Sequence, residues 1–240
     1  MLRVLVTRPE PGASETARRL EMLGFVAVVL PLSETRGLPV DSAGIAENVD
    51  AVAVTSANAL RHAPRDLLAM FAKTPCYAVG GKTASLARQA GFVQVIEGPG
   101  DAAGLAALLG KESLLKSGAE AASVAYLCGR VRLPNFEKLL AAAGIVAVAV
   151  ETYDTVETDA VSVNDFTSPV DIALLHSALG AQALVKIARR PELAKLLAET
   201  VFLCLSERIA AVVAEAGCTK IRVAAEPTEQ ALLFLLAQQG

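Results

Sequence analysis

Short runs of hydrophobic residues, many of them rich in valine, alternate with segments of helical spacing along the whole chain. Most of these runs are too short and too continuously apolar for half-exposed strands, so they predict buried parallel strands. The predicted strands are residues 3–8, 26–32, 51–56, 76–80, 93–97, 124–129, 146–153, 172–177, 201–206 and 221–226. Segments between them, such as ASETARRLEMLGF, have the spacing of helices and end at a glycine, as helices often do. The pattern predicts an α/β fold built on parallel sheets.

The order of these elements is repeated within the chain. For example, DAVAVTSANAL returns as DIALLHSALGAQAL, so that Ser56 corresponds to Ser177. The corresponding segments are residues 4–32 with 124–153, 50–60 with 171–184, and 76–109 with 201–236. Each copy contains five predicted strands in the same order, which suits a doubly wound sheet of the flavodoxin type.

These patterns leave open how the strands divide between two domains. One division is tandem, with a boundary near residue 120. In the other, the chain crosses over near SETRGLPV and returns near YDTVETDAV, so that the first two strands join the last three. The crossover division makes residues 1–35 and 157–240 a discontinuous domain 1, and residues 36–156 domain 2.

Composition and charge exclude several classes of protein. Hydrophobic residues make up 53% of the chain, enough for a large core, and the net charge of −3 argues against a nucleic-acid binder. No apolar run reaches the roughly 20 residues that a membrane span needs. The first residues lack the layout of a signal peptide, so we expect a cytoplasmic protein. We also expect the protein to be a monomer. The four cysteines stand far apart and the two histidines have no partner at ligand spacing, so we expect no metal.

Hydroxyl, small and cationic residues gather just after the predicted strands. Ligands of parallel α/β sheets bind beyond the carboxyl ends of the strands, where helix N-termini also lie, so these residues form the candidate site. They are Thr7, Arg8, Thr55, Ser56, Gly80, Lys82, Thr83, Gly129, Arg130, Arg132, Tyr153, His176, Ser177 and Ser206. Small residues and hydroxyls let an anion approach backbone N–H groups, so this surface suits a ligand with several carboxylates. The serines and threonines are also ordinary helix N-caps, and the arginines can equally be solvated charges.

The run GGKT at residues 80–83 looks like the end of a phosphate-binding P-loop, but the first glycine of that motif is absent. Cys76 stands in its place, and a side chain there obstructs the wrap of backbone N–H groups around a phosphate. The chain also lacks a nucleophile elbow and a dinucleotide-binding glycine pattern after the first strand. A nucleotide-dependent enzyme is therefore only the third candidate function.

The ordered set of these motifs resembles the uroporphyrinogen-III synthase family over the whole chain. The motifs are VLVTRP, AVAVTSANAL, YAVGGKTASLARQAGF, CGRVRLPNFEKLLAAAG, VETYDTV, IALLHS and AAEPTEQALL. The resemblance implies the crossover division: two flavodoxin-like, doubly wound parallel-sheet domains joined by a two-stranded connector. It also implies a lyase of tetrapyrrole and heme biosynthesis, which closes hydroxymethylbilane to uroporphyrinogen III with inversion of ring D and loss of water. The family uses no metal or organic cofactor, and hydroxymethylbilane synthase, which makes the substrate, is the expected transient partner.

The resemblance also implies roles by position. Tyr153 matches the tyrosine suspected of assisting departure of the substrate hydroxyl, and backbone amides around Gly80 are expected to hold substrate carboxylates. The hydroxyl residues expected to bind substrate are Thr55, Ser56, Thr83, Ser177 and Thr228. The remaining residues of the expected binding set are Arg8, Lys82 and Gly129, with Arg130 and Arg132 competing for one basic position. Two positions depart from the family pattern: Ile209 replaces a threonine, and His176 stands where a threonine or serine is more usual.

A non-catalytic, two-domain binding protein for an anionic small molecule is the alternative function. Such a protein would show the same small residues at strand ends and the same scarcity of acidic and basic catalytic groups. Ligand-induced closure without turnover would favour it over the enzyme.

Overall fold

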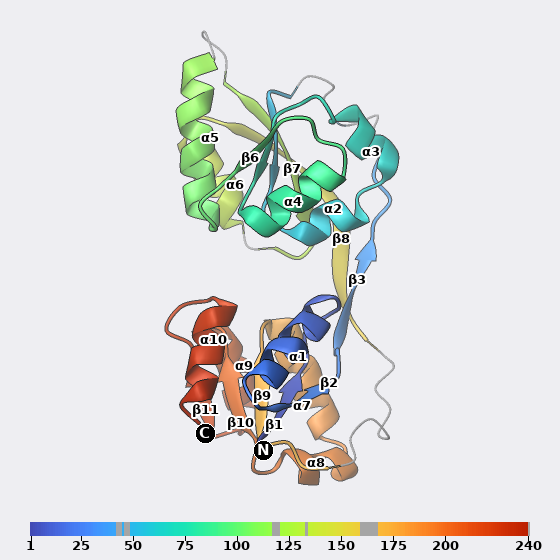
Figure 1. Cartoon of the computed structure of the whole chain (residues 1–240), viewed down its shortest axis with the longest axis vertical. Helices are drawn as coiled ribbons and strands as arrows, with labels where there is room; N and C mark the ends of the chain where they lie inside the picture. Colours follow the sequence, from blue (N-terminus) through green and yellow to red (C-terminus); the bar gives the residue numbers. More distant parts are fainter. Residues whose placement is uncertain (42–44, 46–48, 117–120, 133, 159–167, 240) are drawn as a thin grey trace. The chain divides into compact units, whose positions relative to one another are not determined.

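The computed structural model describes residues 1–41, 45, 49–116, 121–132, 134–158 and 168–239. The chain forms two compact units: unit 1 comprises Met1–Glu34 and Val156–Gly240, and unit 2 comprises Thr35–Thr155. The two boundaries fall inside strands β3 (Ser33–Gly37) and β8 (Val146–Glu157), which are neighbours in one sheet (Figure 1). The segment predicted to return near residues 155–159 is thus the end of a long strand, and Asp159 lies outside the described residues.

Unit 1 is a five-stranded sheet with helices on both faces, in the order β11-β10-β9-β1-β2. Its strands, parallel at every pairing, are β1 (Arg3–Val6), β2 (Val26–Val29), β9 (Ile172–Leu175), β10 (Val201–Cys204) and β11 (Ile221–Val223). Its helices are α1 (Gly12–Met22), α7 (Ala178–Ala188), α8 (Pro191–Leu197), α9 (Glu207–Glu215) and α10 (Glu229–Ala237). Successive strand residues point to opposite faces. Val4 and Val6 therefore pack with α1 and α10, while Leu5 packs with α7, α8 and α9.

Unit 2 repeats this layered plan with a six-stranded sheet in the order β3-β8-β7-β4-β5-β6. Its further strands are β4 (Ala51–Val54), β5 (Cys76–Ala78), β6 (Val95–Glu97) and β7 (Ser123–Gly129). Its helices are α2 (Ala57–His62), α3 (Arg65–Met70), α4 (Gly81–Gln89), α5 (Ala102–Lys116) and α6 (Asn135–Ala142). One face of the sheet packs against α2, α3 and α4, and the other against α5 and α6. Every residue of β4 is buried, as its uninterrupted apolar run predicts.

Both sheets have the flavodoxin order once corresponding strands of the two sequence copies are matched. β2-β1-β9-β10-β11 in unit 1 corresponds to β8-β7-β4-β5-β6 in unit 2. Each of these sets of five strands takes two strands from one copy and three from the other, with β3 as a sixth strand in unit 2, so the chain has the crossover connectivity. The predicted α/β fold with two parallel sheets is confirmed.

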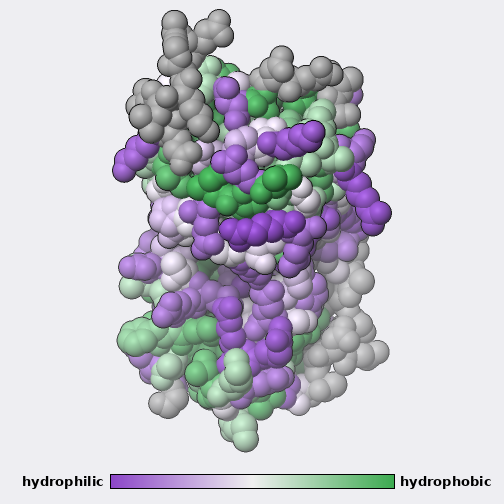
Figure 2. All heavy atoms as spheres, turned by 45° about the horizontal axis from the view of Figure 1, so that its top comes forward, coloured by the Kyte–Doolittle hydropathy of each residue, from purple (hydrophilic) through white to green (hydrophobic). Residues whose placement is uncertain are grey.

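The surface of the helices is mixed, since large hydrophobic residues such as Met22 on α1 and Phe234 on α10 are exposed. On the face shown in Figure 2, hydrophilic residues and smaller hydrophobic areas alternate over the surface. Among the residues that the structure describes, no helix has both the length and the apolar character that crossing a bilayer requires.

Candidate functional site

The carboxyl ends of four neighbouring strands form one edge of the sheet in unit 2. In the order β8-β7-β4-β5, this edge carries Tyr153, Gly129, Ser56 with Thr55, and the turn at Gly80. Parallel pairing with matched register brings these residues together, because Val54 lies opposite Leu127 and Gly129 lies opposite Tyr153. The sequence-predicted residues of unit 2 therefore share one edge.

A register shift in the β7–β8 ladder sets the position of Tyr153. Cys128 pairs with Glu151 but Gly129 pairs with Tyr153, so Thr152 is an extra residue in β8. The buried Thr152 hydroxyl turns inward and donates to the carbonyl oxygen of Ala59 at 2.8 Å. This hydrogen bond links β8 to helix α2. The next residue, Tyr153, lies opposite Gly129 at the carboxyl end of β7.

The ring of Tyr153 lies directly against Gly129. A Cβ atom at position 129 would be 2.7 Å from Cζ of Tyr153 and 3.0 Å from its hydroxyl oxygen, so the ring occupies the space of a side chain. The Tyr153 hydroxyl reaches Ser56 and donates to its Oγ at 3.4 Å. Ser56 in turn is the N-cap of α2, where its Oγ accepts from the N–H of Asn58 at 3.3 Å. The cap interpretation and the site interpretation of Ser56 are therefore compatible.

The hydroxyl of Thr55 is held by a hydrogen bond to a buried tyrosine, Tyr126. It shares a 2.7 Å hydrogen bond with the hydroxyl of Tyr126, which is buried on β7 and packs against Phe136. Burial raises the pKa of Tyr126 to about 12, so this phenol stays neutral. Tyr126 is not among the residues predicted from the sequence, where its one signal is an aromatic residue with a polar tip in the middle of a buried strand.

The Gly80–Thr83 turn leads directly into helix α4. Gly80 is its N-cap in extended conformation, without a side-chain capping bond, so the first N–H groups of the helix have no intrahelical acceptor. Lys82 is exposed in this first turn, whereas Thr83 is buried at 5% exposure. The carboxylate of Glu97 lies beside Gly81, because a Cβ at position 81 would be 3.0 Å from its Oε1. This turn is a favourable anion environment, as the positive end of a helix should be.

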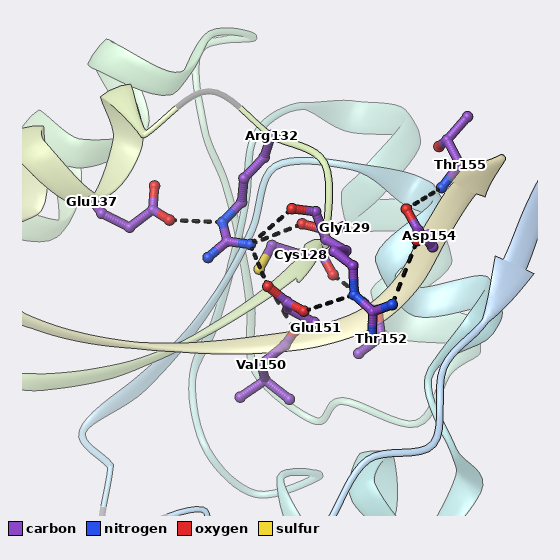
Figure 3. A network of polar contacts seen from close by, with 10 residues as sticks. Cys128, Gly129, Arg132, Glu137, Val150, Glu151, Thr152, Asp154 and Thr155 are labelled. Carbon is purple, nitrogen blue, oxygen red and sulfur yellow. Dashed lines mark hydrogen bonds and ion pairs between the residues drawn. The ribbon is translucent and has the colours of Figure 1, made fainter. Parts of the chain in front are cut away.

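Arg130 and Arg132 both contact Glu151 but differ in what else holds them, and Figure 3 shows Arg132 between Glu137 and Glu151. The Arg132 guanidinium donates to Glu137 at 2.7 Å, to the Gly129 carbonyl at 3.0 Å and to Glu151 at 3.0 Å, and its side chain is only 22% exposed. Arg130 makes longer contacts, 3.3 Å to Glu151 and 3.6 Å to Asp154, and its side chain is 54% exposed. Hydrogen bonding from Arg132 holds the pKa of Glu151 below its usual value.

This difference assigns the two arginines different parts. Arg132 is held by Glu137 on α6, Glu151 on β8 and the carbonyl of Gly129 at the end of β7, whereas Arg130 is the more exposed of the two and has the longer contacts. The Arg130 side chain is therefore the more accessible of the two.

The corresponding edge of unit 1 holds Arg8, Ser177 and Thr228. Ser177 caps α7 by accepting from the Gly180 N–H at 3.0 Å, and Thr228 caps α10 by accepting from the Ala231 N–H at 3.2 Å. Arg8 contacts Glu229 at 3.3 Å, so its charge is partly balanced within the unit. The hydroxyls of this edge serve the helices as caps.

His176 and Ile209, the two departures from the family pattern, are accommodated in unit 1 in different ways. Ile209 is 3% exposed and belongs to the hydrophobic core beneath α9. Both ring nitrogens of His176 are buried and have no hydrogen-bond partner among the described residues. Burial, and secondly the charge of Arg8, lower the pKa of His176 to about 4, so its ring is neutral near pH 7.

Metal-ligating side chains do not gather in the described part of the chain. No group of three or more His, Cys, Asp or Glu residues there is arranged to hold an ion. Cys76, Cys128 and Cys204 are buried, and burial raises the pKa of each thiol to about 12. These cysteines are unreactive core residues.

Comparison with known proteins gives one family. A model of the family described as uroporphyrinogen-III synthase HemD matches residues 14–233. Among solved structures, uroporphyrinogen-III synthetase from Helicobacter pylori is 18% identical to this chain, with a TM-score of 0.62, and the match covers 100% of both chains. A mutant uroporphyrinogen III synthase from the extremely thermophilic bacterium Thermus thermophilus is 21% identical, with coverage of 100% of this chain and 99% of that one and a TM-score of 0.52. No curated protein sequence matches the chain.

Proposed function

Because the chain belongs to the uroporphyrinogen-III synthase HemD family, we propose that the carboxyl edge of unit 2 carries the residues that act on the substrate. The family's reaction is the conversion of hydroxymethylbilane to uroporphyrinogen III, a step of tetrapyrrole biosynthesis, and the protein is a hydro-lyase. For this reaction the protein must assist the departure of a hydroxyl group and must bind the carboxylates of a flexible substrate.

Tyr153 is the residue we propose to assist the departing hydroxyl. A phenol both donates and accepts hydrogen bonds, so Tyr153 can donate to the hydroxyl oxygen as its bond to carbon breaks. Ser56 supports this role by position, because its Oγ lies 3.4 Å from the Tyr153 hydroxyl and accepts its hydrogen bond when no substrate is bound. The phenol has one proton, so it must leave Ser56 in order to donate to the substrate hydroxyl. The observation that carries the proposal is the close approach of the Tyr153 ring to Gly129, which keeps its hydroxyl at the sheet edge.

The substrate carboxylates are proposed to bind along the same edge. The N-terminus of α4, from Gly80 to Thr83, offers backbone N–H groups that have no intrahelical acceptor. Lys82 and Arg130 add exposed positive charge at this edge. Arg132 is proposed to act through the fold of the loop after Gly129. In unit 1, Arg8, Ser177 and Thr228 are proposed as further carboxylate contacts, each at the carboxyl edge of its sheet.

We also propose that the protein acts as a monomer in the cytoplasm and receives its substrate from hydroxymethylbilane synthase by transient contact. The bilane closes spontaneously, so a short transfer between the two enzymes limits its loss. Light scattering on the purified protein tests the oligomeric state, and the rate of isomer III formation at decreasing concentrations of both enzymes tests the transfer. A stable dimer of this chain would overturn the first, and an unchanged rate when the two enzymes are separated by dilution would overturn the second.

A coupled assay tests the proposed function. Porphobilinogen and hydroxymethylbilane synthase generate the bilane, the protein is added, and the oxidised porphyrins are resolved into isomers I and III. Spontaneous closure gives isomer I, so a shift to isomer III establishes the reaction. We expect Tyr153→Phe and Thr83→Ala to reduce formation of isomer III. Isomer I alone from folded protein would contradict the enzymatic function and favour the anion-binding protein.

A further inference from the structure

His62 lies against the residue proposed to assist catalysis. It is the last residue of α2, is half-buried, and its ring stacks on the ring of Tyr153 with centroids 5.9 Å apart and planes inclined by 28°. From its position in ALRHAP, the sequence indicates only a histidine at the end of a helix. Both rings lie within unit 2.

His62 is itself held on two sides. Its Nε2 shares a 2.8 Å hydrogen bond with Oγ1 of Thr35 on β3. Its side chain also packs on Gly37 of the same strand, where an added Cβ would lie 3.8 Å from Cβ and Nδ1 of His62. These contacts anchor the imidazole between β3 and Tyr153.

The two ends of α2 contact different parts of Tyr153. Ser56, at the N-terminus of the helix, meets the hydroxyl, whereas His62, at the C-terminus, meets the ring. The helix is fixed to β8 between these contacts by the hydrogen bond from Thr152 to the Ala59 carbonyl. The helix and the strand therefore define the position of the phenol together.

A tyrosine ring needs such definition because its χ2 torsion is broad. Gly129 lets the ring approach β7 closely, but a glycine has no side chain to restrain the ring. An aromatic neighbour adds a preferred stacking geometry to simple packing. Burial, and secondly the charge of Arg61, lower the pKa of His62, which favours the neutral ring that stacks without bringing a charge to the site.

We infer that His62 is a positioning residue for Tyr153: stacking by its ring holds the phenol so that the hydroxyl stays beside Ser56. The inference rests on the proposed function of Tyr153. It assigns His62 no contact with substrate, so its effect acts on kcat rather than on KM.

Three substitutions separate the contributions of His62. His62→Phe keeps an aromatic ring but loses the hydrogen bond to Thr35, His62→Gln keeps a hydrogen-bonding group but loses the ring, and His62→Ala loses both. We expect kcat to fall roughly 10- to 100-fold in His62→Ala and His62→Gln, and to be largely restored in His62→Phe, with KM unchanged in all three. Asp66→Ala, at an exposed position of α3, is the control and should retain wild-type kcat.

A double-mutant cycle distinguishes failure of this inference from failure of the proposed function. If Tyr153→Phe leaves kcat unchanged, the proposed role of Tyr153 fails. If Tyr153→Phe lowers kcat, His62→Ala should lower it little further in that background, because the orientation of the hydroxyl no longer matters once the hydroxyl is gone. Additive losses would overturn the inference, as would equal kcat in His62→Phe and His62→Ala.

Tyrosine NMR provides a readout independent of turnover. The chain has three tyrosines, of which Tyr77 and Tyr126 are buried in the core, so the signal of Tyr153 can be assigned by substitution. His62→Ala should shift the ring signal of Tyr153 and speed its ring flips, whereas His62→Phe should keep slow flips. An unchanged Tyr153 signal in folded His62→Ala would contradict the inference, and if that variant does not fold, His62→Gln against His62→Phe decides it.

Discussion

Substitution of Gly129 by alanine tests whether the close approach of Tyr153 matters. The added Cβ would lie 2.7 Å from Cζ of Tyr153, whereas carbon atoms in contact prefer about 3.5–4.0 Å. The ring must therefore move by about 1 Å, and a misplacement of that size can cost about 100-fold in rate. We expect Gly129→Ala to lower kcat by up to about 100-fold, equivalent to about 2.7 kcal/mol in the activation free energy.

The same substitution should affect stability much less than it affects the rate. Inserting a methyl group into a closed core costs about 1–3 kcal/mol, but Tyr153 is only half-buried and its ring can move toward solvent. We expect a loss of about 1 kcal/mol in the free energy of unfolding, measured by urea denaturation.

The assay is formation of isomer III at saturating bilane, with Tyr153→Phe measured alongside. Gly110→Ala is the matched control, since it adds the same methyl group on α5, where the new Cβ meets Cβ of Ala143 at 3.2 Å. The control should retain wild-type kcat. Wild-type kcat in Gly129→Ala, together with a low kcat in Tyr153→Phe, would refute the link between this glycine and catalysis.

Three further predictions follow from the contacts of individual side chains. Arg132→Ala should lower the free energy of unfolding by about 2 kcal/mol, because it removes hydrogen bonds to two carboxylates. Arg130→Ala should instead raise KM and leave the free energy of unfolding within about 0.5 kcal/mol of wild type. Equal unfolding midpoints for the two variants would contradict this difference. Tyr126→Phe should cost about 1 kcal/mol and raise KM, because Thr55 loses its hydrogen-bond partner, and thermal unfolding with steady-state kinetics checks both. The lowered pKa of His176, about 4 when folded, means that the unfolded chain binds its proton first as pH falls. Stability should therefore decline from pH 6.5 to about pH 4 more steeply in wild type than in His176→Gln, and parallel melting curves would exclude the effect.

Many strands and helix ends of this fold can be predicted from local sequence patterns. Apolar runs such as AVAV at residues 51–54 are buried strands, and Gly24 and Gly144 follow helices with positive φ angles of 83° and 74°, as their positions predict. The repeat predicted that each copy contains five strands in the same order along the chain. It could not decide which copies combine, because pairing between distant strands depends on contacts that no local pattern records.

The candidate site shows the same limit at the level of side chains. Residues at strand ends could be named from the sequence, because parallel sheets bind ligands at that edge. Their roles in binding and catalysis stay predictions. What could not be foreseen is how they are held: sequence patterns left Arg130 and Arg132 equivalent, and the structure separates them by exposure and by contacts with Glu137 and Glu151.

The sequence by itself determined the α/β class, the internal repeat and the family, because hydrophobic spacing and ordered motifs are properties of the chain alone. Only the tertiary structure brought Tyr153 against Gly129 and His62, and Thr55 against Tyr126. These contacts join residues far apart in the chain. They depend on strand register and on one extra residue in β8, and a shift of one residue would turn each side chain to the opposite face.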